Sequence, residues 1–119
     1  MSISALFLGG LERPAPVVLS GTTTEDVYEA ADDYSTIATV SIANQSGASA
    51  TVECYFYDGS TDYTVWVGSI DDDVTQVLTY TPLRLLTGHK LRVKGASGIT
   101  VTPFVTRHHP NEAASNRLG

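Results

Sequence analysis

The chain is predicted to be all-β and to fold as an antiparallel two-sheet β-sandwich, immunoglobulin-like or jelly-roll-like, of seven or eight short strands. Three observations predict this fold class. Thr, Ser, Gly and Val are abundant while charged residues make up only 17% of the sequence, a composition that favours strands over helices. Apolar and polar residues alternate in several segments, as they do in half-buried strands. Turn residues recur about every eight to twelve positions, the spacing of a sandwich.

One domain with an extension at each end is expected within the 119 residues. Residues 1–16 are predicted to form an extended N-terminal arm, because their apolar stretch ends at two glycines and Pro14 and Pro16 keep the chain extended. The sandwich is expected over residues 17–107. Residues 108–119 are a polar tail with little to bury.

The first strands of the sandwich are predicted from apolar or alternating runs. Residues 17–19 form a short apolar run, and residues 38–43 alternate between apolar and polar side chains. Residues 44–47 predict a turn. Residues 51–57 then form the clearest strand, with an apolar face on one side and tyrosines on the other.

Further strand-like segments follow at 63–67, 74–80, 82–86, 90–94 and 99–106. The first of these is expected to pair with the preceding strand as a β-hairpin, because the short connection between them contains Asp58-Gly59. Proline cannot donate a backbone hydrogen bond, so Pro103 predicts that the last strand lies at a sheet edge.

Charge is distributed unevenly along the chain. Residues 1–80 contain twelve acidic residues and one base, whereas residues 81–119 contain six bases and one acid, which gives a net charge of −6. An acidic protein of this kind is not expected to bind nucleic acid through its phosphates. The asymmetry would pair the two parts within one fold, or let a basic surface meet an acidic neighbour.

Cellular location is constrained by absences in the sequence. Cys54 is the single cysteine, so neither a disulfide framework nor a cysteine-based zinc site is expected. No signal peptide is recognised at the N-terminus, and no apolar stretch is long enough for a membrane span. These features fit a protein made in a reducing cytosol, with no membrane partner.

No catalytic, cofactor-binding or metal-binding constellation is identified, and the protein is not expected to be an enzyme. Cys54 lies on the predicted core face, where a thiolate is disfavoured. The acidic loops around Asp58 and at 71–73 could supply oxygen ligands for calcium, but they lack the alternating pattern of a calcium loop. His108 and His109 point in opposite directions in an extended chain and are not expected to share a metal.

Four aromatic residues cluster on and beside the predicted hairpin, namely Tyr55, Tyr57, Tyr63 and Trp66. Three interpretations of this cluster stay open: cross-strand aromatic pairing inside the sandwich, contact with another protein, or stacking on a carbohydrate.

A longer pattern extends from Ile37 to Val105. Its first strand ends in I-x-N-x-S-G at 42–47. The aromatic strand 52–57 follows, and later comes L-x-x-G-x-x-L-x-V at 85–93. This pattern is similar to that of small virion structural proteins of tailed bacteriophages, which coat capsids or tails. The similarity covers a little over half of the chain.

The resemblance implies a non-enzymatic virion protein, made in the host cytoplasm, that stabilises a phage capsid as a decoration or cement protein. Its expected partners are the major capsid protein or other virion proteins, and further copies of itself, with a trimer as the expected oligomer. The alternative is a tail or head–tail connector protein. A carbohydrate-binding β-sandwich module comes third.

The residues expected to contact partners combine three features: the apolar arm, the aromatic cluster and the basic C-terminal third of the chain. The arm is suited to lying across a neighbouring subunit, and the basic residues to facing an acidic surface. The candidates are Leu6, Phe7, Leu8, Tyr55, Tyr57, Trp66, Arg84, Arg92 and Lys94.

Overall fold

A computed structural model describes residues 11–12, 14–31, 34–79 and 83–108. In these residues there are ten strands and no helix, so no helix there is long and apolar enough to cross a membrane. The strands are β1 (Leu11–Glu12), β2 (Val17–Val18), β3 (Glu25–Glu29), β4 (Tyr34–Asn44), β5 (Ala50–Tyr57), β6 (Asp62–Ile70), β7 (Val74–Leu78), β8 (Leu83–Leu85), β9 (Lys90–Lys94) and β10 (Ile99–His108). The all-β prediction is confirmed, and the additional strands are short segments such as β1, which falls within the stretch expected to be an arm.

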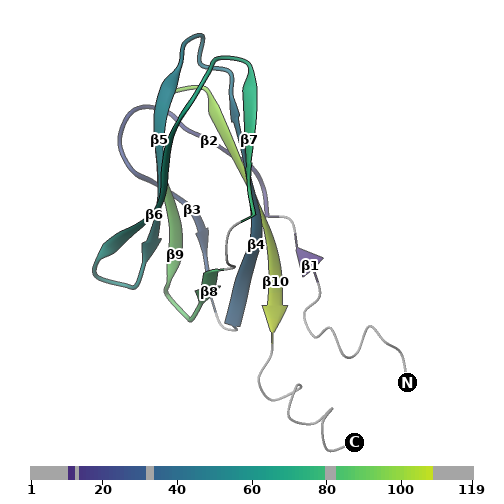
Figure 1. Ribbon diagram of the computed structural model, residues 1–119. Helices are drawn as coiled ribbons and strands as arrows, with labels where there is room; N and C mark the ends of the chain where they lie inside the picture. The colour runs from purple at the N-terminus through teal and green to yellow at the C-terminus, as the bar shows by residue number, and fades with distance from the viewer. Residues whose placement is uncertain (1–10, 13, 32–33, 80–82, 109–119) are drawn as a thin grey trace, which may run out of the picture.

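The strands form two antiparallel sheets that pack face to face (Figure 1). One sheet has the order β3-β9-β5-β6 and includes the predicted β5–β6 hairpin. The other has the order β1-β10-β4-β7, with β2 also paired to β10 and β8 also paired to β4. The two-sheet sandwich expected from the sequence is therefore the observed fold.

The core lies between the two sheets and is made by every second residue of the central strands. Val52 and Cys54 of β5 face inward, as expected from the alternation, and both are fully buried. Leu91 and Val93 of β9 do the same in the neighbouring strand. Burial of side chains of this kind contributes roughly 1.5–3 kcal/mol each, which makes this layer the main source of stability.

Asn44 ends β4 and is the one fully buried polar side chain among the described residues. Its Nδ2 donates to the carbonyl oxygens of Ala48 (2.9 Å) and Ile70 (2.8 Å). Its Oδ1 accepts from the backbone N–H (3.0 Å) and the hydroxyl (2.7 Å) of Ser46. The turn needs Gly47 at a φ of 95°, which a residue with a Cβ rarely adopts. One side chain thus connects the β4–β5 turn to the end of β6.

The prediction that Pro103 marks a sheet edge is wrong for the strand as a whole. β10 lies inside its sheet, with β4 on one side and both β1 and β2 on the other. The registers explain how a proline is accommodated there, because β2 pairs with Thr100 and Val101 while β1 pairs with Val105 and Thr106. Among the described residues, Pro103 therefore has no partner on that side, and its missing N–H leaves no gap in the ladder.

Candidate protein-contact surfaces

The outer face of the four-stranded sheet carries four of the residues predicted to contact partners. Tyr55 and Tyr57 point outward from β5, and Arg92 and Lys94 point outward from β9. The strands are in register so that Tyr55 lies opposite Arg92. Sequence alternation alone placed these side chains on one face, and strand pairing brought them together. We call this surface the charged face.

An ion-pair network crosses the charged face. Asp26 of β3 lies 2.8 Å from Lys90 Nζ and 3.0 Å from Arg92 Nε, and Arg92 Nη1 lies 3.1 Å from Asp62 at the start of β6. The buried Nε of Arg92 is within ion-pair distance of Asp26, but the two groups do not have the geometry of a hydrogen bond. Arg92 thereby links acidic residues contributed by both edge strands of the sheet.

The ring of Tyr57 completes this network. Lys90 Nζ lies 5.6 Å from its centroid and the Arg92 guanidinium carbon lies 4.9 Å from it, both within the range of cation–π contacts. The hydroxyl of Tyr57 donates to the Gly59 carbonyl in the hairpin turn at 2.9 Å. Arg92 and Tyr57 are therefore engaged within the chain itself. Lys94 is exposed and forms no ion pair with a described residue.

Two pKa values respond to this arrangement. The hydrogen bond from Lys90 to Asp26 raises the pKa of Lys90 above its ordinary value. Partial desolvation, followed by the hydrogen bond and charge of Glu53, raises the pKa of Tyr55. Because the folded protein binds the Lys90 proton more tightly than the unfolded chain, this contribution to stability is complete below about pH 10.4 and is lost as pH rises further.

Replacing Asp26 with asparagine is expected to lower the free energy of unfolding slightly, because Lys90 and Arg92 lose a shared anion. The difference from the wild type should be largest at neutral pH and low salt, since salt screens exposed pairs and Lys90 loses its proton at high pH. Urea unfolding at two salt concentrations and two pH values measures it. Glu29→Gln is the matched control, because Glu29 lies 4.0 Å from Lys90 and should contribute less. An equal effect of both variants, or no salt dependence, would contradict the expectation.

Trp66 does not join the tyrosines on the charged face. It lies opposite Cys54 in the β5–β6 pairing and packs against the core from the inner side of the sheet. A Cβ on Gly68 would come within 2.6 Å of the indole ring, so the ring lies directly over that glycine. The β5–β6 register shifts between Cys54 and Tyr55, where Val65 is the extra residue of β6, and this shift separates the two halves of the hairpin. Tyr55, Tyr57 and Trp66 therefore do not form one aromatic platform.

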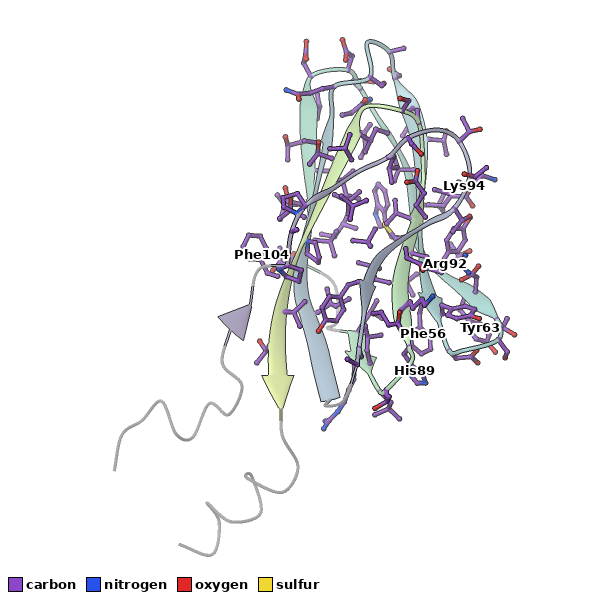
Figure 2. The ribbon with its side chains drawn as sticks, turned by 180° about the vertical axis from the view of Figure 1, so that it is seen from behind. Phe56, Tyr63, His89, Arg92, Lys94 and Phe104 are labelled. Atoms are coloured by element: carbon purple, nitrogen blue, oxygen red, sulfur yellow. The ribbon has the colours of Figure 1, made fainter. Side chains whose placement is uncertain are left out.

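Tyr63 contributes to a separate aromatic cluster at the hairpin end of the sandwich. Its ring stacks on Phe56 with centroids 6.2 Å apart, and His89 meets Phe56 edge-on at 5.3 Å (Figure 2). The Nδ1 atom of His89 accepts a hydrogen bond from the Leu86 backbone N–H. These contacts agree with cross-strand aromatic pairing, the first of the three interpretations of the hairpin aromatics.

The remaining predicted contact residues lie elsewhere. Arg84 is exposed on β8, in the six-stranded sheet, and so is not part of the charged face. Leu6, Phe7 and Leu8 lie outside the described residues. Arg84 therefore does not share a surface with Arg92 and Lys94, since β8 and β9 belong to different sheets.

The outer face of the six-stranded sheet is a surface that sequence reasoning did not identify. It contains exposed Val18 (60%), Val77 (51%) and Phe104 (41%), from three different strands. Figure 2 shows Phe104 on the opposite side of the sandwich from Arg92 and Lys94. The registers place six small or hydroxyl-bearing residues among the three apolar ones: Thr39, Ser41, Ala43, Thr75, Thr100 and Thr102. None of these nine residues is charged, and we call them together the neutral face. Arg84 of β8 is exposed on the same side of the sheet, between the inward-facing Leu83 and Leu85, and so lies beside the neutral face.

The acidic loops and the cysteine were the other candidates for chemistry. Asp58 accepts hydrogen bonds from the backbone N–H groups of Ser60 and Thr61, which lower its pKa. Asp71 and Asp72 accept from Ser49 and Gly47 across the loops. Within the described residues no group of three or more potential metal ligands is found. Burial raises the pKa of the Cys54 thiol to about 12, which disfavours the reactive thiolate at neutral pH.

Comparison with protein families finds no family model that matches this chain, and no curated protein matches it either. Among solved structures, the chain is similar to a pentameric capsid protein from metagenomic phage sequences, with a TM-score of 0.42 and 13% identity over 90% of this chain and 63% of that one. It is also similar to the family 32 carbohydrate-binding module of NanJ from C. perfringens, with a TM-score of 0.43 and 9% identity over 79% of this chain and 93% of that one. A third similar structure is the Anabaena sensory rhodopsin transducer, with a TM-score of 0.43 and 15% identity over 64% of this chain and 96% of that one. Scores and identities this low, spread over such different proteins, do not indicate a function for this chain.

Proposed function

We propose that this chain is a non-enzymatic virion structural protein that binds and stabilises a phage capsid as a decoration protein. The proposal starts from the sequence pattern between Ile37 and Val105, which resembles small tailed-phage virion proteins. The single observation that carries it in the structure is the neutral face. Three large apolar side chains are exposed together there, without a charge among them, in a chain whose net charge is −6.

Such a surface supports contact with other proteins. The cores of protein interfaces are depleted in charged residues and enriched in aromatic ones, whereas the rest of a soluble surface is not. Val18, Val77 and Phe104 add nothing to the core, which is complete on the other side of the same sheet. Their exposure has a function if another chain covers them, as in a shell of many copies.

The charged face fits the same role in a different way. Ion pairs link Lys90 and Arg92 of β9 to acidic residues of the two edge strands β3 and β6, so the network supports the rigidity of the sheet. Exposed Lys94 and the acidic loop residues at 71–73 remain available for steering toward partners. The glycan alternative has less support, because Trp66 lies on the inner side of the sheet from which Tyr55 and Tyr57 point outward.

The copy number of this chain in purified particles tests the proposal. A decoration protein should be present in an amount comparable to that of the major shell protein, by quantitative mass spectrometry of washed particles. A small fraction of that amount would overturn decoration in favour of a tail or connector protein. Absence from particles would overturn the virion assignment altogether, and glycan binding would then be tested with the isolated protein.

A further inference from the structure

The neutral face has a size that limits what can cover it. From Val18 on β2 to Val77 on β7 the sheet crosses three inter-strand spacings, about 14 Å. From Thr100 to Phe104 along β10 the distance is about 13 Å. This uncharged part of the face is smaller than the roughly 800 Å² per partner of a standard interface between folded domains, and Arg84 lies beside it on the same face. It matches the footprint of one extended segment.

The chain contains a segment of suitable chemistry at its own N-terminus. Residues 1–8 have no charged side chain and include Ile3, Leu6, Phe7 and Leu8. In an extended conformation the six residues from Ile3 to Leu8 span about 20 Å, which is comparable to the diagonal of the neutral face. A segment and a surface that both lack charged side chains can be brought into contact without burying a charged side chain.

The sheet topology indicates which copy receives the segment. Leu11 lies opposite Thr106, near the end of β10, and Glu12 lies opposite Val105. β1 therefore runs from the end of β10 toward its middle, in the direction of the neutral face. Residues 1–8 precede Leu11, and continuing the line of β1 backward leads away from that face. An extended continuation of that line would reach a neighbouring molecule rather than its own sheet.

We propose that the N-terminal segment 1–8 of one copy lies across the neutral face of a neighbouring copy. Val18, Val77 and Phe104 of the receiving copy would then be covered by the apolar side chains of the segment. The inference goes beyond the proposed function, because it concerns contact between copies of this chain and does not depend on a capsid. It would hold equally for a tail protein.

Disulfide trapping between two variants, each with one introduced cysteine, tests the contact. Native Cys54 is buried with a thiol pKa of about 12, so introduced cysteines are the reactive ones. Leu6→Cys and Val77→Cys proteins of distinguishable mass are mixed and oxidised at high protein concentration. The proposal predicts a mixed disulfide dimer on a non-reducing gel, several-fold more abundant than with the control pair Leu6→Cys and Thr51→Cys. Thr51 is exposed on the other sheet, so this control matches accessibility but not position.

Three outcomes would overturn the proposal. One is equal yield from the test and control pairs, which would mean random collision. Another is an intramolecular disulfide in the Leu6→Cys/Val77→Cys double variant, which would place the segment on its own sheet. The last is the absence of any cross-link while circular dichroism shows both variants folded. Each outcome is independent of the copy number in particles, so failure here and failure of the virion assignment are distinguishable.

Discussion

Replacing Asn44 with alanine is expected to lower the free energy of unfolding by about 3 kcal/mol, measured by urea denaturation. The side chain is fully buried and makes four hydrogen bonds, two as donor and two as acceptor. Removing it leaves the Ile70 carbonyl without this donor in a buried position, and it releases the Ser46 turn. The cost exceeds that of one exposed hydrogen bond because no water replaces a buried partner.

Two further variants test the reason for this loss. Gln45→Ala changes the exposed neighbour of Asn44 and should alter stability by less than about 0.5 kcal/mol. Asn44→Asp keeps the shape and the acceptor Oδ1 but loses the Nδ2 donor to Ala48 and Ile70, so it should also destabilise strongly. If Asn44→Ala were as stable as Gln45→Ala, the hydrogen bonds would not hold the turn as described.

Stability is also expected to fall steeply with pH above 9, with Cys54 as a main cause. Burial raises the pKa of this thiol from 9.0 to about 12 in the folded protein, so the unfolded chain releases the proton first. The contribution of the protonated thiol to stability is fully present below pH 9 and is lost as pH rises toward 12. By pH 11 the loss in the free energy of unfolding is about 3 kcal/mol.

The Cys54→Ala variant isolates this effect from the titration of Lys90 and the tyrosines. At pH 8 it should be less stable than the wild type by about 1 kcal/mol, because it leaves a small cavity. From pH 8 to pH 11 it should lose less stability than the wild type, so the difference shrinks or reverses. The measurement is urea denaturation under reducing conditions at both pH values. Equal losses in the two proteins would show that the thiol is not protected from ionisation.

The sequence pattern used for the phage resemblance has a structural explanation. In I-x-N-x-S-G, Asn44 and Ser46 make the buried hydrogen bonds of the β4–β5 turn, and Gly47 has a positive φ. In L-x-x-G-x-x-L-x-V, Gly88 has a φ of 85°, and Leu85, Leu91 and Val93 are fully buried. These residues build turns and core, so the pattern describes how a sandwich is assembled. Val18, Val77 and Phe104 of the neutral face lie outside both motifs.

The residues predicted to contact partners also differ in how far local sequence predicted their direction. Alternation along β5 and β9 predicted the outward direction of Tyr55, Tyr57, Arg92 and Lys94, since direction depends only on position within a strand. Trp66 is close to the tyrosines in sequence, but it points to the other side of the sheet. Its direction depends on the register shift at Val65, which no local pattern reveals.

Alternation and turn residues act over a few positions, so they were sufficient to predict the fold class, the hairpin and the inward residues of the central strands. Three features depend on long-range pairing and could not be predicted in this way: the position of β10 between β4 on one side and β1 and β2 on the other, the burial of Asn44, and the neutral face. Val18, Val77 and Phe104 are far apart in sequence and unremarkable singly. Pairing of β2, β10, β4 and β7 places them on one surface, and such long-range pairing depends on the chain as a whole.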